Sequence, residues 1–419
     1  MAKIRPFVCV RPAAHMAATI AALPYDVYSR KEACEVVKNN PKSFLAIDRA
    51  ETQFGSEVDT YADCVYEKAA SLLEEWKKDG SFITDEETSY YVYELTMNGR
   101  TQTGIVAVAS IDDYINGVIM KHENTRADKE VDRIKHVDVC SAQTGPIFLA
   151  YRANETIRDA VDITKQTKPL YDFIADDGIR HRVFKVAGEA LNISIENAFQ
   201  SINEIYIADG HHRAASAVKV GLKRRSEHPD YNGTEEFNYF LSVLFPDEEL
   251  LIMDYNRVLK NLNGLSEAEF LNKMNSLFEV TLLDEGAKEN ASKDYRKPTK
   301  KGEFSMFLGG KWYSCKIHDK DRSEDPVKGL DVSLLQNLLL EPVLGIKDPK
   351  TDKNIDFVGG IRGLDELERR CNEDAVCSFA MYPTSILELF KVADAKLLMP
   401  PKSTWFEPKL RSGLFIHEF

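Results

Sequence analysis

The sequence predicts an α+β protein with a mixed-sheet core and a second α+β lobe at its C-terminal end. Hairpins and helices alternate along the chain, whereas a doubly wound parallel sheet would show a regular order of strand and helix. Asn98-Gly99 lies between two β-rich runs and is a strong hairpin signal. The 419 residues exceed a single small core, so the length favours two or three domains or one elaborated α/β unit.

The N-terminal part carries clear start and stop signals for its elements. Ser29 and Glu32 form a capping box ahead of a helix that Asn40-Pro41 ends. An apolar stripe with helical spacing predicts an amphipathic helix over residues 61–78. The other elements expected here are strands over residues 7–10 and 44–47, and the two hairpin strands over 90–96 and 103–109.

The middle of the chain continues this alternation. A charged helix is expected over residues 126–136, and another helix is expected to start near Arg213. Apolar runs predict the remaining elements, which are strands over residues 147–151, 205–208 and 239–245, and a strand end followed by a helix within 183–200.

A change of pattern near Pro246 predicts the boundary between a domain of residues 1–246 and a lobe of residues 247–419. Ser266 and Glu269 form a second capping box in this lobe. The lobe is further expected to contain a polar loop over residues 288–301, a hairpin over 304–317, a buried helix over 332–340 and a helix over 385–392. We expect the lobe to contribute residues to the same site as the first domain.

The composition indicates a globular chain with an acidic exterior. Asp and Glu outnumber Lys and Arg by 67 to 54, and the net charge of −13 disfavours nucleic acid as a partner. The seven cysteines include no CxxC pair, which favours free thiols in a reducing compartment. Arg11, Pro12 and His15 interrupt the only leader-like segment, so we expect an unprocessed cytoplasmic protein without a membrane partner. The sequence carries no signal for an oligomeric state.

The most informative segment is Asp209-Gly210-His211-His212-Arg213, which joins an apolar strand to a helix. Cations at a helix N-terminus oppose the macrodipole by about 0.3–1 kcal/mol each, so this choice makes sense if an anion binds among them. Free backbone N–H groups, both imidazoles and the Arg213 guanidinium could then converge on phosphate oxygens. Gly210 allows the backbone to approach closely. The chain has no Walker A pattern, and no third ligand is spaced to complete a zinc site with the two histidines.

The Gly210–Arg213 stretch resembles the phosphate-binding motif of the ParB/sulfiredoxin superfamily. Nearly the whole chain resembles the DUF1015 family, which is related to the free serine kinases of that superfamily. Further blocks that carry this resemblance are Pro24-Tyr25-Asp26-Val27, His122-Glu123-Asn124-Thr125 with Asp132-Arg133, and Met399-Pro400-Pro401-Lys402-Ser403-Thr404-Trp405-Phe406-Glu407-Pro408-Lys409. His211 stands where sulfiredoxin has its cysteine, which excludes sulfinate repair. Ala214-Ala215 replaces the Tyr-Glu of many relatives and leaves recognition of the donor open.

The resemblance implies a ParB/sulfiredoxin-like core and a kinase, that is, a transferase acting on an alcohol group. ATP, ADP or pyrophosphate would be the donor, free L-serine the acceptor and Mg²⁺ the cofactor. The alternative is a protein that senses a nucleotide or phosphate without turnover. A DNA-partitioning role is opposed by the net charge of −13, and a hydrolase would need a nucleophile motif such as GxSxG.

The expected site residues fall into three groups. Asp26, Glu123 and Asp209 are the candidate proton acceptors. Asp209 and Glu123 rank above Asp26 as site residues, the sequence does not choose the base, and Asp209 is also a candidate ligand of Mg²⁺. Phosphate is expected on the Gly210–Arg213 motif and on two lysines. The two lysines are Lys402 and Lys409. The third group, expected to contact the acceptor, consists of His122, Arg133, Ser403 and Thr404.

Each of these residues also has an ordinary structural interpretation. Glu123 could cap a helix, His122 could be a surface histidine, and Arg133 could either bind the acceptor carboxylate or point to solvent. Asp48 and the acidic run 85–87 are expected to be solvated surface charges.

Overall fold

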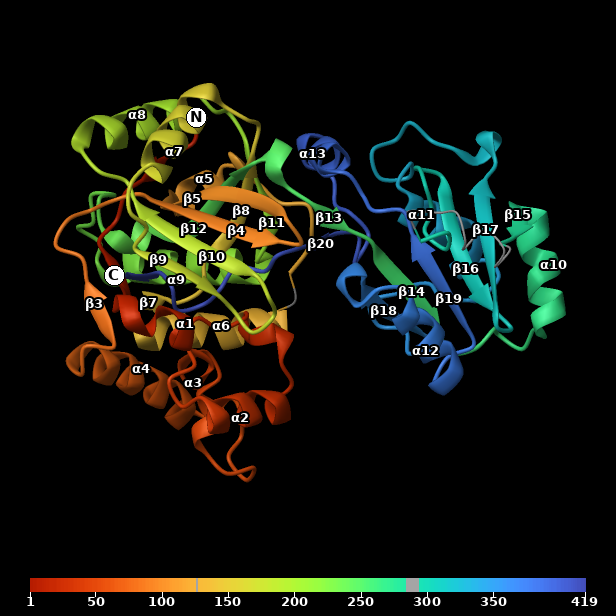
Figure 1. Ribbon diagram of the computed structural model, residues 1–419, viewed down its shortest axis with the longest axis horizontal. Coiled ribbons are helices and arrows are strands. Elements are labelled where there is room, and N and C mark those ends of the chain that lie inside the picture. The colour runs from red at the N-terminus through yellow and green to blue at the C-terminus, as the bar shows by residue number, and fades with distance from the viewer. Residues whose placement is uncertain (126, 284–293) are drawn as a thin grey trace. The chain divides into compact units, whose positions relative to one another are not determined.

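The computed structural model describes residues 1–125, 127–283 and 294–419, which form two compact units. Unit 1 comprises Met1–Leu250 and Pro408–Phe419, and unit 2 comprises Leu251–Glu407. The sequence-based division placed all of residues 247–419 in the second lobe, whereas the last twelve residues belong to unit 1. Figure 1 labels the elements of both units, each of which is described by itself.

Unit 1 is built on a nine-stranded mixed sheet. The strand order is β6 (Ile119–Met120), β11 (Ile205–Asp209), β8 (Ile147–Tyr151), β12 (Tyr239–Pro246), β5 (Arg100–Ser110), β4 (Tyr91–Met97), β10 (Arg180–Lys185) and β9 (Tyr171–Ile174), with β1 (Ile4–Arg5) paired to β5. The pairs β6–β11 and β8–β12 are parallel and the others are antiparallel, which confirms the predicted mixed sheet. The predicted hairpin is also confirmed, since Asn98 and Gly99 link β4 to β5 with φ values of 52° and 77°.

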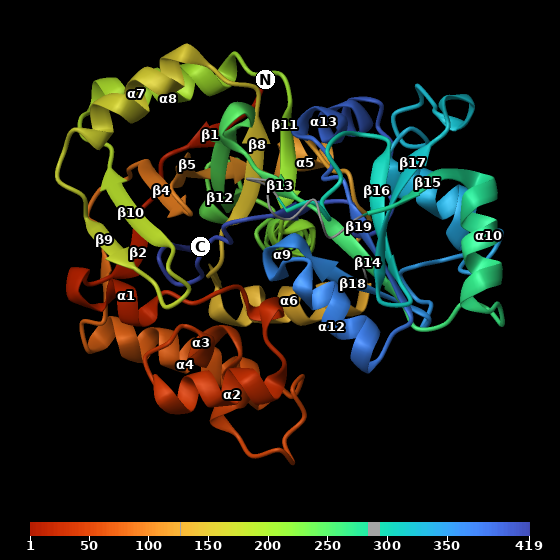
Figure 2. The same ribbon diagram turned by 45° about the vertical axis from the view of Figure 1, so that its right-hand side comes forward.

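The helices of unit 1 pack around this sheet in two groups. Figures 1 and 2 show α7 (Glu155–Lys165) beside α8 (Glu189–Gln200), and α6 (Ala127–Cys140) between α9 (His211–Glu227) and α4 (Asp63–Lys78). Apolar side chains of the sheet, α7, α8 and α9 form one hydrophobic core. The short helices α1 (Ala17–Ile20) and α5 (Ile111–Ile115) complete the unit.

The C-terminal residues complete a second, four-stranded sheet in unit 1. Its order is β3 (Phe82–Thr84), β2 (Cys9–Pro12), β21 (Ile416–Glu418) and β7 (Ala142–Gln143). The last strand of the chain therefore lies between β2 and β7, and Leu414, Phe415 and Ile416 are fully buried. The rings of Tyr91 and Tyr93 pack against Phe415.

In the N-terminal part, the predicted capping box and amphipathic helix are confirmed, one predicted strand is wrong and another is displaced. Both hydrogen bonds of the Ser29–Glu32 capping box are present at the start of α2 (Arg30–Asn39). The predicted strand over residues 44–47 is instead the helix α3 (Leu45–Asp48). All four of its residues are buried against α2 and α4, so the run is apolar on every side and shows no helical period. The first predicted strand is displaced, since residue 7 makes only an isolated bridge to Ser89.

Unit 2 contains a six-stranded antiparallel sheet. Its order is β15 (Phe278–Leu282), β17 (Lys311–Ile317), β16 (Glu303–Leu308), β19 (Cys377–Met381), β14 (Tyr255–Leu259) and β18 (Ile355–Gly359). Its helices are α10 (Glu267–Leu277), α11 (Asp331–Leu335) with the π-helical continuation Gln336–Leu340, α12 (Asp365–Glu373) and α13 (Ile386–Asp394). The Ser266–Glu269 capping box and the hairpin over 304–317 are confirmed. Part of the predicted loop over 288–301 lies outside the described residues.

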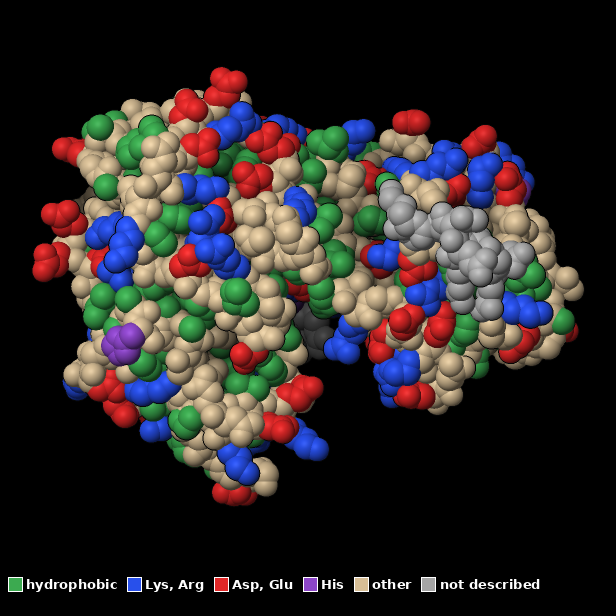
Figure 3. All heavy atoms as spheres, in the orientation of Figure 1, with side chains coloured by type: hydrophobic (Ala, Val, Ile, Leu, Met, Phe, Trp, Pro, Cys, Tyr) green, Lys and Arg blue, Asp and Glu red, His purple; other side chains and the backbone are tan. Residues whose placement is uncertain are grey.

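The chain enters and leaves unit 2 through a two-stranded ribbon. Strand β13 (Ile252–Met253) pairs antiparallel with β20 (Trp405–Phe406), so that Met253 stands opposite Trp405. The two ends of unit 2 are therefore adjacent. All seven cysteines are free, and among the described residues no helix is long and apolar enough to cross a membrane. Figure 3 shows acidic and basic side chains interspersed on one face of the molecule.

A buried carboxyl in unit 2 should make its stability depend on pH. Asp331 accepts a hydrogen bond from the Gly302 N–H at 2.8 Å, but its Oδ1 atom is buried without a partner among the described residues. Burial raises the pKa of Asp331 from 3.8 to about 6, against the effect of the Gly302 hydrogen bond. Protonation of Asp331 therefore contributes fully to the stability of unit 2 below pH 3.8, and this contribution is lost as the pH rises through 6.

Asp331→Asn should remove this dependence because an amide keeps the Gly302 hydrogen bond and carries no charge. In urea unfolding, the stability of the variant relative to the native protein should rise by about 2.4 kcal/mol between pH 4 and pH 8. A difference in stability that does not change with pH would contradict the assignment.

Candidate active site

The turn between β11 and α9 brings the predicted phosphate motif together. Gly210 is the N-cap of α9 with φ 92° and ψ 29°, a left-handed conformation that favours glycine. A Cβ at this position would stand 3.1 Å from Nε of Arg213, so the missing side chain also lets the guanidinium lie against the backbone. No side chain caps this helix and its first turn has no acidic residue. The backbone N–H groups of α9 are thus available to an anion.

Arg213 supplies a cation at this turn that forms no ion pair with a carboxylate of the described residues. Its Nη1 donates to the carbonyl oxygen of Pro146 at 2.6 Å, which fixes the direction of the side chain. Within the described parts of the chain, no Asp or Glu forms an ion pair with it. A half-buried guanidinium with unused N–H groups is suited to bidentate binding of a phosphate.

Asp209 and Lys409 meet at the same turn although 200 positions separate them. The Lys409 ammonium lies 2.8 Å from Oδ2 of Asp209, and the N–H of Gly210 donates to Oδ1 at 2.8 Å. Burial raises the pKa of the Asp209 carboxyl, but the positive charges of Lys409 and Arg213 outweigh it and lower the pKa well below its usual value. Asp209 is therefore a firmly ionised carboxylate and a weak base.

His122 and His211 form a buried pair beneath the turn. The backbone N–H of His122 donates to Nε2 of His211 at 3.5 Å, and the two rings are perpendicular with centroids 4.5 Å apart. Burial lowers the pKa of His122 to about 4 and that of His211 well below its usual value, so both rings are neutral near pH 7. The alternative from the sequence, that His122 is a surface histidine, is therefore wrong. His211 turns Nε2 toward His122, and only the half-buried His212 keeps a more exposed imidazole.

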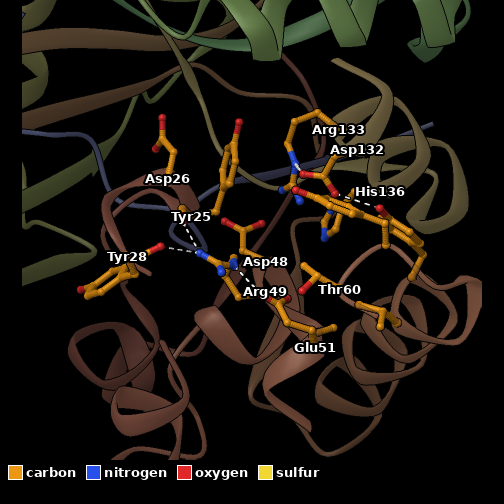
Figure 4. A pocket seen from close by; sticks show the side chains of 14 residues that line it. Tyr25, Asp26, Tyr28, Asp48, Arg49, Glu51, Thr60, Asp132, Arg133 and His136 are labelled. Carbon is orange, nitrogen blue, oxygen red and sulfur yellow. Dashed lines mark hydrogen bonds and ion pairs between the residues drawn. The ribbon is translucent and has the colours of Figure 1, made fainter. Parts of the chain in front are cut away.

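Two adjoining cavities in unit 1 connect this turn with the N-terminal motifs. The larger one, the Arg133 cavity, has a volume of about 170 Å³ (Figure 4). The smaller one, the Arg213 cavity, has a volume of about 30 Å³ and includes Thr144 and Gly145 among its walls. The four residues that line both cavities are Tyr25, Asp48, Arg133 and His136.

Arg133 forms a buried cationic wall of both cavities. Its Nε lies 2.9 Å from Oδ2 of Asp132, and its guanidinium lies 4.0 Å from the ring centre of Tyr25. Burial lowers the pKa of Arg133, but the charges of Asp132 and Asp48 and the Tyr25 hydroxyl raise it above its usual value. The side chain therefore stays charged, and it points into a cavity rather than to solvent.

Asp48 is a site residue that the sequence analysis missed. The expected surface charge is wrong, because the residue is only 4% exposed and lines both cavities. Its Oδ1 accepts a hydrogen bond from the Thr144 hydroxyl at 2.8 Å. The next residue, Arg49, donates to the carbonyl oxygens of Tyr25 and Tyr28 at 2.9 and 2.7 Å and thereby fixes the loop that carries Tyr25. The signal in the sequence that could have identified Asp48 is its position directly after the apolar run of residues 44–47.

The remaining predicted residues lie in three places. Asp26 is exposed and lines the Arg133 cavity. Glu123 is half-buried between β6 and α6 and lines neither cavity. The other three belong to unit 2, where Lys402 has a φ of 58°, the Ser403 hydroxyl donates to the Pro400 carbonyl at 2.7 Å, and Thr404 is half-buried.

The chain is similar to several solved structures. Among solved structures, a free serine kinase in complex with AMP is 15% identical, with a TM-score of 0.33 over 74% of this chain and 91% of the other. SbnI from Staphylococcus aureus is 11% identical, with a TM-score of 0.37 over 74% and 87% of the two chains. A conserved hypothetical protein from Pyrococcus furiosus is 16% identical, with a TM-score of 0.33 over 74% and 94%.

No curated protein matches the chain. The sequence profile described as "Protein of unknown function (DUF1015)" matches residues 4–333, which is well over half of the length. The chain therefore belongs to the DUF1015 family.

Proposed function

We propose that this protein is a small-molecule kinase that transfers a phosphoryl group to the hydroxyl of a small acceptor. The observation that carries the proposal is the position of Arg213. Its guanidinium has no carboxylate partner among the described residues, stands at the N-terminus of α9, and lines a cavity that shares walls with the Arg133 cavity. A phosphate held by Arg213 would therefore adjoin a molecule in the Arg133 cavity.

The donor side of this site is the Gly210–Arg213 turn with Lys409. Phosphoryl transfer depends mainly on neutralising phosphate charge and on holding the attacking and leaving oxygens in line. The N–H groups of α9 and the Arg213 guanidinium supply that neutralisation, and Lys409, which is paired with Asp209, is a proposed further phosphate contact. ATP, ADP and pyrophosphate all present the phosphate group that this turn would bind.

The acceptor side is the Arg133 cavity. Its volume of about 170 Å³ is below the roughly 300–1,000 Å³ of pockets for drug-sized ligands, so it suits a small metabolite. The buried Arg133 guanidinium would bind an acceptor carboxylate. Free L-serine, the acceptor implied by the resemblance, has a carboxylate and a primary hydroxyl on three carbons and fits these requirements.

The acceptor proton needs a carboxylate near the cavity, and the geometry favours Asp26. The serine oxygen would bond to phosphorus as the phosphorus–oxygen bond to the donor breaks, and the hydroxyl proton would pass to Asp26 at the cavity wall. Asp209 is too weak a base for this role. With one ionised carboxylate beside the phosphate turn, Asp209 suits Mg²⁺ that is bound mainly through donor phosphates. Such an ion would neutralise phosphate charge.

The test is an assay of the full-length protein with Mg²⁺, L-serine and each of ATP, ADP and pyrophosphate in turn. We expect phosphoserine, detected by ³¹P NMR and mass spectrometry, with at least one donor. Omitting serine should leave only slow hydrolysis of the donor. If calorimetry shows donor binding but no hydroxylated acceptor is phosphorylated, the protein is a nucleotide or phosphate sensor instead.

A further inference from the structure

We propose that Asp48 binds the ammonium group of the acceptor, so that the Arg133 cavity selects a zwitterionic amino acid over a hydroxy acid of the same size. The inference rests on the proposed function for the identity of the occupant. It assigns to Asp48 a role in specificity.

The surroundings of Asp48 leave its charge open to a ligand. Oδ1 accepts one hydrogen bond from Thr144, while an ionised carboxylate has about four acceptor positions. Among the described residues, no Lys, Arg or His forms an ion pair with it. Arg133 acts on the Asp48 charge only at a distance. A buried carboxylate without an ion pair is costly, and a ligand ammonium would reduce that cost.

A second carboxylate in the same cavity provides the contrast. Glu51 is also buried and lines the Arg133 cavity, but it lies 2.6 Å from Nε of Arg49 and is neutralised there. Of these two buried acids, Asp48 is the one whose charge the protein leaves without an ion pair.

The position of Asp48 relative to Arg133 fits the two charges of an amino acid. Figure 4 shows the Asp48 carboxylate pointing toward the space between Tyr25 and Arg133. The Arg133 guanidinium shares this space, stacked on Tyr25 and paired with Asp132 on its other side. The ammonium and the carboxylate of an α-amino acid are both attached to the α-carbon and lie close together. A small cavity with one acid and one guanidinium therefore accommodates both. The hydroxyl group of glycerate would leave the Asp48 charge unmatched.

The experiment compares L-serine with L-glycerate, which replaces the ammonium by a hydroxyl. In Asp48→Asn, the KM for L-serine should rise by roughly 10- to 100-fold, the effect of losing one hydrogen bond between charged groups. The KM for L-glycerate should change by less than about threefold, and kcat with saturating serine should stay within a few-fold of the native value. Glu51→Gln is the matched control, and its ratio of serine to glycerate KM should equal that of the native protein.

Three outcomes would overturn the inference. Equal losses of kcat with both acceptors at unchanged KM would make Asp48 a proton acceptor. An unchanged ratio of the serine and glycerate KM values in Asp48→Asn would show that Asp48 plays no part in selection. A native protein that binds neither compound in calorimetry would show that the cavity does not bind such an acceptor. If the native protein transfers no phosphoryl group but binds L-serine, and folded Asp48→Asn does not, the kinase proposal fails while the ammonium site stands.

Discussion

Arg213→Ala is expected to reduce kcat/KM for phosphoryl transfer by about 10³-fold, the lower end of the range for arginines that act on transferring phosphoryl groups. The side chain has no ion pair among the described residues, and its one hydrogen bond goes to the Pro146 carbonyl. Its removal therefore takes charge from the phosphate turn without leaving an unpaired carboxylate. Stability should change little, and a thermal melt checks this before the kinetics are measured.

Arg213→Lys separates charge from geometry. A lysine keeps the positive charge but cannot donate two parallel hydrogen bonds to a phosphate or keep the same contact with Pro146. We expect activity between those of the alanine variant and the native protein, together with weaker donor binding in calorimetry. Donor binding of native strength in Arg213→Ala would refute the assignment of the phosphate site, whichever acceptor the protein uses.

Removing the last twelve residues should prevent unit 1 from folding. A chain that ends at Glu407 lacks β21 and the fully buried Leu414, Phe415 and Ile416. Burial of such side chains contributes about 1.5–3 kcal/mol each, so their sum approaches the roughly 5–15 kcal/mol by which a whole domain is stable. Circular dichroism and binding of a hydrophobic dye should report a loosely packed chain.

Excision of most of unit 2 should be tolerated, in contrast. Met253 and Trp405 stand opposite each other in the β13–β20 ribbon, so Asn-Gly can join them as a two-residue hairpin loop. The joined chain retains all of unit 1, including Lys409, and should unfold cooperatively. A molten product from the excised chain would show that unit 2 is needed for the fold. A well-folded chain ending at Glu407 would show that the tail is dispensable.

Local signals in the sequence predicted most of the elements and the phosphate turn. Capping boxes at Ser29 and Ser266, the Asn98-Gly99 hairpin and the β11–α9 turn each depend on neighbouring residues, and all are present in the structure. The sequence analysis singled out both Lys409 and Asp209 but not their contact, because that contact joins positions 200 residues apart.

The missed features depend on tertiary burial. Residues 44–47 carry an apolar run that fits a strand or a buried helix equally, and the packing of α2 and α4 around it decides for a helix. The same packing encloses Asp48, which looks like any surface acid in the sequence. His122 is likewise buried by His211, which lies 89 positions further along the chain. The local sequence around Asp48 and His122 does not indicate that distant residues bury them.

The position of β21 has a consequence for the order of events on the ribosome. Unit 1 begins at Met1, yet it is completed by residues 408–419, which are synthesised after unit 2. About 160 residues of unit 2 come first, and this takes roughly 8–30 s at about 5–20 residues per second. During that interval the edges of β2 and β7 have no partner, and the rings of Tyr91 and Tyr93 lack their cover. Asp209 therefore gains its partner Lys409 only after unit 2 has been made.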